Sequence, residues 1–251
     1  MSGPAHVSEA GKPLALVTGA SRGIGAALAV ALAGAGHHLV LTGRDEKRLV
    51  ETEDRIHASG GTATIAPLDL FRLDDIDRLG AAIAARWDRL DLLVLNAAML
   101  GTLAPLAHVA PREFEQVMAL NVTAQWRLLR AFDPLLRRAR GIVVGLTSSV
   151  AGGGRAYWGP YAASKAALEV LLSTYADEMQ ALGLRVLLVD PGGTATRMRR
   201  AAYPGEDQST LKPPDVVATR IVETLAAGLP KGLTRLALDR AGTPRLSAAP
   251  A

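Results

Sequence analysis

Cysteine is absent from the 251 residues of this chain, and its absence excludes several kinds of chemistry. A chain without thiols has no disulfide, no thiolate metal site and no cysteine nucleophile. We therefore look for catalytic groups among oxygen- and nitrogen-bearing side chains, and we expect no bound metal. Because such a chain suits a reducing compartment, we predict a cytoplasmic protein.

Aromatic residues are also scarce, at 4% of the chain, whereas apolar residues of all kinds make up 49%. Alanine, leucine and valine must therefore fill most of the core. Charged residues account for 21%, which is an ordinary balance for a globular domain. The length favours one domain with one sizeable core over two domains.

A strong excess of one charge and a long hydrophobic run are both missing. The formal net charge is only +4, and the basic residues between 127 and 140 do not alternate with aromatic ones, so we expect no nucleic-acid partner. No apolar run reaches the ~18 residues that a membrane span needs, so we expect no membrane partner. Residues 1–12 lack the apolar core of a secretory signal, and we predict a flexible leader there and a loose tail at 243–251.

Short apolar runs alternate with helix-favouring segments along residues 13–242. This alternation predicts one α/β domain with a doubly wound, Rossmann-like parallel sheet in three layers. The predicted strands are 14–18, 38–42, 62–67, 92–95, 142–146, 184–189 and 233–238. The predicted helices are 26–35, 46–58, 72–88, 111–138 with a bend at Pro134, 161–182 and 213–227. Ligands bind such sheets at the carboxyl ends of the strands.

A glycine-rich turn, Gly19-Ala-Ser-Arg-Gly-Ile-Gly25, lies between the first strand and the first helix. Glycines let the backbone approach a pyrophosphate closely, and the start of a helix offers free N–H groups and a positive dipole end. The strand, turn and helix together predict a dinucleotide site here. The alternative is a structural turn that binds no ligand.

The end of the second strand indicates which dinucleotide is preferred. An acidic residue at this point would accept a hydrogen bond from a ribose 2′-hydroxyl, but the chain has Gly43 followed by Arg44. A guanidinium suits a 2′-phosphate, and Arg22 in the glycine turn offers a second one. We predict a preference for NADP(H), with NAD(H) also possible, and we expect Asp45 to cap the next helix.

Tyr161 and Lys165 lie four residues apart in a helix-favouring segment, which places both side chains on one face. A nearby ammonium favours the phenolate and would lower the pKa of the tyrosine from its usual value of about 10. The pair is therefore a candidate device for proton transfer. Asn121 lies in an apolar stretch and must find hydrogen-bond partners if it is buried, so it is a candidate brace.

These motifs resemble those of the short-chain dehydrogenase/reductase family, over about residues 14–242. The turn from Thr18 matches the family's TGxxxGxG, Tyr161 and Lys165 match its YxxxK, and Asn121 matches its helix asparagine. Pro191-Gly192 with Thr196 matches its PGxxxT. The resemblance implies a cofactor site formed by Gly19, Ser21, Arg22, Gly23, Ile24, Gly25, Arg44, Asp69, Leu70, Asn96, Ala97, Tyr161, Lys165, Pro191, Gly192, Thr194 and Thr196.

The resemblance also implies catalytic roles. Tyr161 would protonate a carbonyl oxygen in reduction and act as the base in oxidation, while Lys165 would lower its pKa and hold the nicotinamide ribose. Asn121 would hold a water for proton relay. Ser148 would orient the substrate oxygen, since it lies thirteen residues before Tyr161, although Ser149 begins a sequence that usually follows the catalytic serine and stays an alternative.

The chain departs from the family pattern at Leu95-Asn96-Ala97-Ala98, where the family usually has NNAG. Ala98 replaces a glycine, and its Cβ would restrict backbone approach beside the cofactor. Two alternatives to an oxidoreductase also fit this fold: a catalytically silent nucleotide-binding sensor, and a lyase or epimerase. The intact site residues argue against the first. The short segment after Thr196 argues against the second.

The substrate would be a small carbonyl compound or alcohol, bound under a lid at about 197–211 that carries Arg197, Arg199 and Arg200. We further expect a homodimer or homotetramer, because the two long helices have more apolar residues than one sheet-facing stripe needs. In the second helix, Ala163, Ala166, Ala167 and Val170 could face the sheet. Leu168, Leu171, Leu172 and Tyr175 would then spread over a wider arc.

Overall fold

The central sheet of this computed structural model, which describes residues 11–248, has the strand order β3-β2-β1-β4-β5-β6-β7-β8. The strands are β1 (Leu14–Thr18), β2 (His38–Gly43), β3 (Thr62–Pro67), β4 (Leu92–Leu95), β5 (Ile142–Leu146), β6 (Arg185–Asp190), β7 (Gly232–Leu238) and β8 (Pro244–Ala248). All neighbours are parallel except β7 and β8. The order reverses direction between β1 and β4, which is where doubly wound sheets bind ligands.

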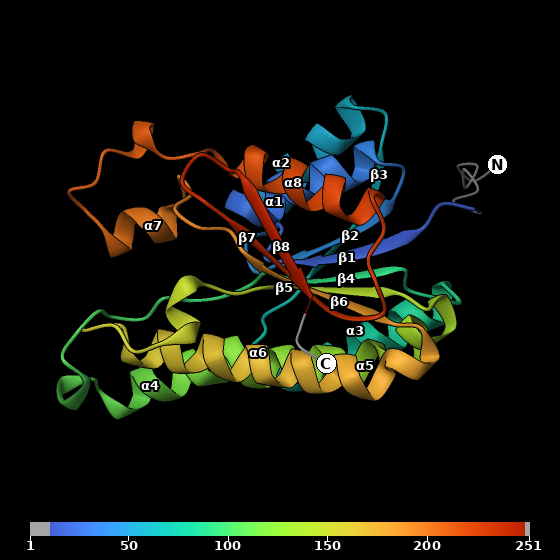
Figure 1. Ribbon diagram of the computed structural model, residues 1–251. Helices are drawn as coiled ribbons and strands as arrows, with labels where there is room; N and C mark the ends of the chain where they lie inside the picture. Colours follow the sequence, from blue (N-terminus) through green and yellow to red (C-terminus); the bar gives the residue numbers. More distant parts are fainter. Residues whose placement is uncertain (1–10, 249–251) are drawn as a thin grey trace.

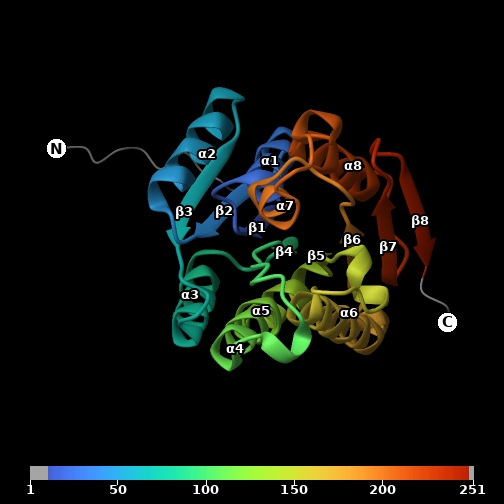
Figure 2. The same cartoon turned by 90° about the vertical axis from the view of Figure 1, so that its left-hand side faces the viewer.

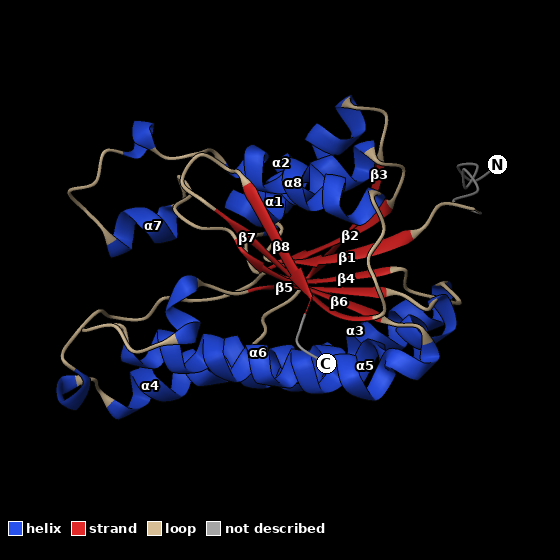
Figure 3. Cartoon of the chain, in the orientation of Figure 1, coloured by secondary structure: helices blue, strands red, loops and turns tan. Residues whose placement is uncertain are grey.

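Helices cover both faces of the sheet, which gives the three layers that the sequence predicts (Figures 1 and 3). One face is covered by α1 (Gly23–Gly34), α2 (Glu46–Ala58) and α8 (Pro214–Ala226). The opposite face is covered by α3 (Leu73–Arg86), α4 (Pro111–Met118), α5 (Ala124–Ala139) and α6 (Gly159–Met179). The short helix α7 (Arg197–Ala202) stands apart, over the carboxyl ends of the strands (Figure 2). The predicted fold class is confirmed.

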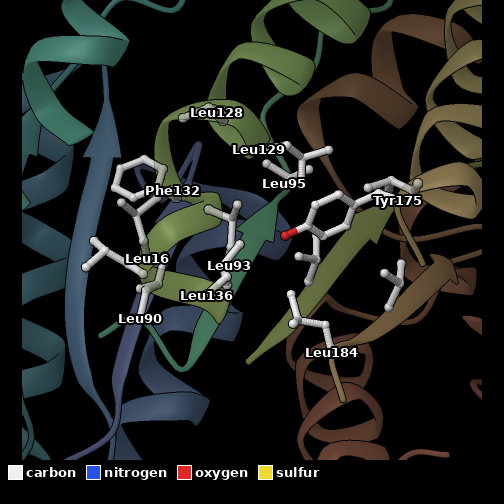
Figure 4. Packing of buried hydrophobic residues seen from close by; sticks show 14 of the residues in the cluster. Leu16, Leu90, Leu93, Leu95, Leu128, Leu129, Phe132, Leu136, Tyr175 and Leu184 are labelled. Carbon is white, nitrogen blue, oxygen red and sulfur yellow. The ribbon is translucent and has the colours of Figure 1, made fainter. Parts of the chain in front are cut away.

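Two apolar layers hold the helices to the sheet. The layer under α5 and α6 includes Leu16, Leu93, Phe132 and Tyr175, which Figure 4 shows packed between the helices and the strands. Strands β1 and β4 are buried along their whole length, as expected where helices cover both faces of a parallel sheet. Among the described residues, no helix is long and apolar enough to cross a membrane.

The predicted bend of the helix 111–138 is in the wrong place. The helical segment continues through Pro134, and the irregularity is a single π-helical turn at Ala119–Thr123, between α4 and α5. An extra residue in a helical turn reorients the neighbouring side chains and is frequent at functional sites. Here the turn contains Asn121, which is fully buried.

Two further expectations need correction. Residues 243–251 were expected to be loose, but Pro244–Ala248 pair with β7 as the antiparallel strand β8; residues 1–10 and 249–251 lie outside the described residues.

The predicted faces of α6 are also reversed. Leu168, Leu172 and Tyr175 are buried in the core, whereas Ala163 and Val170 are exposed, because the larger side chains gain more from burial.

Candidate active site

A cavity of about 1040 Å³ opens at the carboxyl ends of the strands, between the glycine turn, the loop after β4, α6 and α7. It brings together most of the residues predicted to bind a cofactor. These are Gly19, Ser21, Arg22, Gly23, Ile24, Arg44, Asp69, Leu70, Asn96, Ala97, Tyr161, Lys165, Pro191 and Thr196. Ala98, the departure from the family pattern, lines the same cavity.

The glycine turn is locked onto the loop that follows β4. The Thr18 hydroxyl donates to the carbonyl of Val94 at 3.0 Å and accepts from the backbone N–H groups of Asn96 and Ala97 at 3.0 and 3.1 Å. The Asn96 amide in turn donates to the carbonyl of Thr18 at 2.8 Å. These bonds fix the floor of the cavity without using charged groups.

Three residues of the predicted cofactor set do not line the cavity. A Cβ on Gly25 would lie 2.3 Å from the carbonyl oxygen of Gly19, and a Cβ on Gly192, whose φ is +60°, would lie 2.3 Å from the carbonyl oxygen of Leu238. These glycines permit close backbone packing behind the wall. Thr194 is buried, and its hydroxyl donates to the carbonyls of Pro191 and Gly192, so its side chain braces the loop.

Positive charge gathers at the outer end of the cavity, where Arg22, Arg44, Arg48 and Arg197 all lie along the wall. Burial lowers the pKa of Arg22, and the positive charges of Arg197, Arg48 and Arg44 lower it further. Asp45, as expected, caps α2 by accepting from the backbone N–H of Arg48. Sequence reasoning missed Arg48, although its place one turn after Arg44 at the start of a helix is a usable signal.

The donors at this site fit a dinucleotide with phosphate groups. No side chain caps the start of α1, and the residues of its first turn, Gly23 and Ile24, line the cavity. The buried hydroxyl of Thr42, at the end of β2, has no hydrogen-bond partner among the described residues and borders the same space. Free N–H groups at a helix start and nearby guanidinium groups are a ready site for anionic phosphates.

At the other end of the cavity, α6 presents Tyr161 and Lys165, which are 7% and 3% exposed. The Lys165 ammonium donates to the carbonyl of Leu146 at 2.7 Å and lies 5.7 Å from the centre of the Tyr161 ring. Burial lowers the pKa of Lys165 to about 8, although the negative charge of Glu169 opposes this change.

The expectation that Lys165 lowers the pKa of Tyr161 is not met by this geometry. Burial raises the pKa of Tyr161 to about 12, and the negative charge of Asp190 adds to the increase. The ammonium is directed at Leu146 instead of the phenol, so it does not offset these two effects. Near neutral pH the tyrosine therefore holds its proton, as a general acid must.

A charged cluster beneath Lys165 was not predicted from the sequence. Glu169 lies one helical turn after Lys165, accepts from the Thr147 hydroxyl at 2.6 Å and pairs with Arg235 of β7 at 2.5 Å. Thr147 itself borders the cavity. The cluster therefore joins the end of β5, α6 and β7 close to Lys165.

Asn121 acts as a brace between three parts of the site. Its amide nitrogen donates to the Ser164 hydroxyl at 3.0 Å and to the carbonyl of Met99 at 2.9 Å, and its amide oxygen accepts from the N–H of Met99 at 2.9 Å. The side chain thus ties the π-helical turn to α6 and to the loop after β4. The expected brace is present, while a role in proton relay stays a prediction.

The two candidate serines lie at the end of β5, where the chain leaves the sheet. Ser148 is half-buried in extended backbone, and Ser149 is exposed at the start of a short 3-10 turn, Ser149–Gly152. Neither lines the cavity, which ends at Thr147 on this strand. Ser148 is the more buried of the two and stays the predicted residue, with Ser149 as the alternative.

Apolar side chains pack around Tyr161. Val150, Tyr161 and Ala162 form a small buried cluster. Leu100, Trp158 and Met198 pack against it. Met198 comes from α7, so the helix over the strand ends contributes directly to the surroundings of the tyrosine.

The segment after α7 also contacts the loop that precedes α6. The rings of Trp158 and Tyr203 lie 5.7 Å apart, and the guanidinium of Arg155 lies within 6 Å of both. Arg199 stacks on Tyr203 at 3.8 Å and forms two hydrogen bonds with Glu206. The segment 197–211, which is predicted to be a lid, therefore contacts the loop before α6, and Arg199 has an acidic partner within this segment.

Comparisons with known proteins agree with this geometry. The family model described as short chain dehydrogenase matches residues 13–207. The chain belongs to the short-chain dehydrogenase/reductase family. The resemblance predicted from the motifs is thus confirmed, and the glycine turn, Asn121, Tyr161 and Lys165 all fall inside the matched part.

Among the relatives of this short-chain dehydrogenase is the oxidoreductase YciK of Escherichia coli, which is 40% identical over 79% of this chain and 80% of its own. A solved structure of an Escherichia coli short chain dehydrogenase complexed with NADPH is 36% identical, with a TM-score of 0.82, and covers 91% of this chain and 96% of its own. The gluconate 5-dehydrogenase of Gluconobacter oxydans is 33% identical over 77% of this chain and 75% of its own.

Proposed function

We propose that this short-chain dehydrogenase/reductase is an NADP(H)-dependent oxidoreductase that interconverts a carbonyl compound and a secondary alcohol. The observation that carries the proposal is that one cavity holds both a phosphate-binding end, formed by the glycine turn and arginines, and a proton-transfer end, formed by Tyr161 and Lys165. A catalytically silent sensor is not supported, because relatives with named activities are dehydrogenases and reductases.

Each residue of the site has its own role in the proposed reaction. A bound nicotinamide would supply the hydride to the carbonyl carbon in reduction. The Tyr161 hydroxyl donates its proton to the carbonyl oxygen, so that one hydride and one proton give the alcohol. Ser148 holds that oxygen in place, and the phenolate that remains on Tyr161 regains its proton from solvent. Lys165, whose ammonium lies 5.7 Å from the centre of the Tyr161 ring, holds the nicotinamide ribose, as the family resemblance implies.

Two observations support NADP(H) over NAD(H). Similar solved structures contain NADP or NADPH. In addition, Arg22, Arg44 and Arg48 line the cavity where the second strand ends, while Asp45 is engaged as a helix cap. Guanidinium groups bind a phosphate bidentately and more strongly than a neutral ribose hydroxyl.

The surroundings of Tyr161 favour a substrate whose carbonyl carries an apolar group. Leu100, Val150, Trp158 and Met198 offer no charge to a bound molecule, and Arg199 is occupied by Glu206. A polyhydroxylated substrate would leave its hydroxyl groups without partners against these side chains, which is costly.

The experiment is a screen of the purified protein with NADPH and NADH, following absorbance of the reduced nicotinamide. We expect oxidation of NADPH with aromatic or aliphatic ketones, slower oxidation of NADH, and little turnover of polyhydroxylated ketones. Tight NADPH binding without turnover of any carbonyl compound or alcohol would contradict the proposed reaction. A cytoplasmic location and a homodimer or homotetramer stay predictions of the same proposal.

A further inference from the structure

Arg155, an exposed residue of the loop before α6, lies beside two aromatic rings. Its guanidinium carbon is 5.4 Å from the centre of the Trp158 ring and 5.6 Å from the centre of the Tyr203 ring. These two rings come from different segments, the loop before α6 and the segment after α7, and lie 5.7 Å apart. A guanidinium that contacts aromatic rings keeps its N–H groups free to donate to a further acceptor.

The positive charge of Arg155 is not balanced by a carboxylate within residues 11–248. Its printed contacts are the two rings, whereas Arg199, which also stacks on Tyr203, forms two hydrogen bonds with Glu206. The charge of Glu206 is shared further with Arg240, at 3.8 Å. Arg155 can therefore bind an anionic group without first losing an acidic partner.

The backbone beside Arg155 has a conformation that is costly for a residue with a side chain. The N–H of Trp158 donates to the carbonyl of Arg155 at 3.1 Å and closes a tight turn, in which Tyr157 has a φ of +73°. Such backbone conformations are found mostly where the surrounding structure fixes them, and they cluster at ligand-binding and active sites. The turn brings the Arg155 side chain into contact with the Trp158 ring.

Trp158 connects this arginine to the proton-transfer end of the cavity. Its ring lies 5.9 Å from the ring of Tyr161, edge to face, and packs against the apolar cluster that includes Val150 and Met198. One aromatic ring thus contacts both the general acid and the guanidinium of Arg155. A substrate with its carbonyl oxygen at Tyr161 would place an apolar chain against this cluster and could reach Arg155 with its far end.

We propose that Arg155, supported by the rings of Trp158 and Tyr203, binds a carboxylate at the far end of the substrate. The substrate is then an oxo acid whose carbonyl group and carboxylate are separated by an apolar chain. This inference rests on the proposed function and names its substrate class. A guanidinium binds a carboxylate through two parallel hydrogen bonds, so Arg155 would determine specificity without taking part in proton transfer.

The test compares ketones with oxo acids of the same length. Initial rates of NADPH oxidation are measured with 2-pentanone, 2-heptanone and 2-nonanone, and with 4-oxopentanoate, 6-oxoheptanoate and 8-oxononanoate, in which a carboxylate replaces the last methyl group. For the wild type we expect kcat/KM to be about tenfold higher for at least one oxo acid than for its ketone, as for a charge-assisted hydrogen bond. The series of lengths shows which chain reaches Arg155.

The ratio of the two kcat/KM values is then measured for variants. Arg155→Gln should lower this ratio about tenfold, and Arg155→Lys, which keeps the charge but not the planar group, should restore part of it. Arg112→Gln is the matched control, because it removes the same charge from an exposed position at the start of α4, and it should leave the ratio unchanged. A thermal melt of each variant checks that the fold is retained.

A wild type that turns over ketones and oxo acids equally well at every length would overturn the inference and leave the proposed function intact. The same conclusion follows if Arg155→Gln lowers both kcat/KM values by the same factor, because Arg155 would then only support the contact between the loop and the segment after α7. Binding of NADPH by the wild type without turnover of any of these compounds would instead contradict the proposed function.

Discussion

Lys165 lies one helical turn from Tyr161, yet its ammonium donates to the carbonyl of Leu146 at 2.7 Å and not to the phenol. The tyrosine is left in apolar surroundings, with Asp190 as the charge that adds to its raised pKa. A neutral phenol is the form needed to protonate a carbonyl oxygen. A neutral Tyr161 can act as the acid in reduction, while oxidation first requires loss of the phenolic proton.

Replacement of Tyr161 by phenylalanine should reduce turnover about 10²- to 10⁴-fold, which is the usual contribution of a positioned general acid. The ring is retained, so NADPH affinity should stay within about twofold of the wild type. Steady-state rates and a fluorescence titration with NADPH measure the two effects. Tyr157→Phe is the matched control, because Tyr157 is exposed and lies four residues earlier. Substantial turnover by Tyr161→Phe would exclude the assigned role.

Replacement of Asp190 by asparagine should shift the pH dependence of oxidation. A negative charge near a phenol favours its neutral form and raises its pKa, so removing that charge lowers the pKa of Tyr161 from about 12. The rising limb of the oxidation rate, which follows the phenolate, should then move to lower pH. The amide oxygen can still accept from the N–H of Gly192, as the carboxylate does at 3.0 Å.

The control for this shift is Asp177→Asn, an exposed change of the same kind on α6. Rates of alcohol oxidation at saturating cofactor, measured between about pH 6 and 11, give the profile. A profile of Asp190→Asn that coincides with the wild type would show that Asp190 does not tune the tyrosine.

Replacement of Arg44 by alanine should raise the KM for NADPH about tenfold or more and leave that for NADH nearly unchanged. Its guanidinium borders the cavity at the end of β2, where it can form charge-assisted hydrogen bonds with a 2′-phosphate. Initial rates with each cofactor measure the effect. Lys47→Ala removes a neighbouring exposed charge that does not line the cavity. Equal changes for both cofactors would mean that Arg44 does not distinguish them.

Two glycines of α1 offer a matched test of packing. A Cβ on Gly25 would lie 2.3 Å from the carbonyl oxygen of Gly19, whereas a Cβ on Gly34 would meet no atom within 4 Å. Gly25→Ala should lower the free energy of unfolding by about 1–3 kcal/mol and weaken NADPH binding, because the glycine turn must shift. Gly34→Ala should be neutral or slightly stabilising. Urea denaturation and NADPH titration decide between these outcomes, and equal stability of the two variants would contradict the expectation.

Assembly can be tested through the outer surface of the long helices. Val170 of α6 is 65% exposed, and Trp126 of α5 and Phe114 of α4 are 44% and 40% exposed, so the helices of the predicted interface carry large apolar side chains that a second copy would bury. Light scattering should give a multiple of the 26.2 kDa protomer. Val170→Lys should reduce that mass, whereas Leu246→Lys on β8 should not. A wild-type protein of protomer mass would refute the predicted oligomer.

The sequence was sufficient for the layers and for the placing of Tyr161 and Lys165 together on one helix beside the cavity. Apolar strands, helical periodicity and the glycine turn depend on neighbouring residues, so β1, α2, β3, β4 and β5 begin and end where they were predicted. The spacing of Tyr161 and Lys165 likewise fixes a shared helix face. These local patterns do not predict which group a side chain on that face contacts. The Lys165 ammonium donates to the backbone carbonyl of Leu146.

Features that depend on distant parts of the chain were missed for the same reason. The pairing of Glu169 with Thr147 and Arg235 joins three elements that are far apart in sequence. The π-helical turn at Asn121 is set by partners on α6 and on the loop after β4, while Pro134 carried the more obvious local signal. Arg197 and Arg22 are likewise far apart in sequence, yet they border the same cavity.

Strand β8 also bears on the tendency of the chain to aggregate. β7 is buried along most of its length, and without β8 its outer edge would present free N–H and C=O groups beside apolar side chains. Such an edge is a template for pairing with other chains, and proline and charge on an outermost strand discourage this. Pro244 and Arg245 are part of β8, so this strand should discourage pairing with other chains, and a chain cut after Thr243 should aggregate more readily.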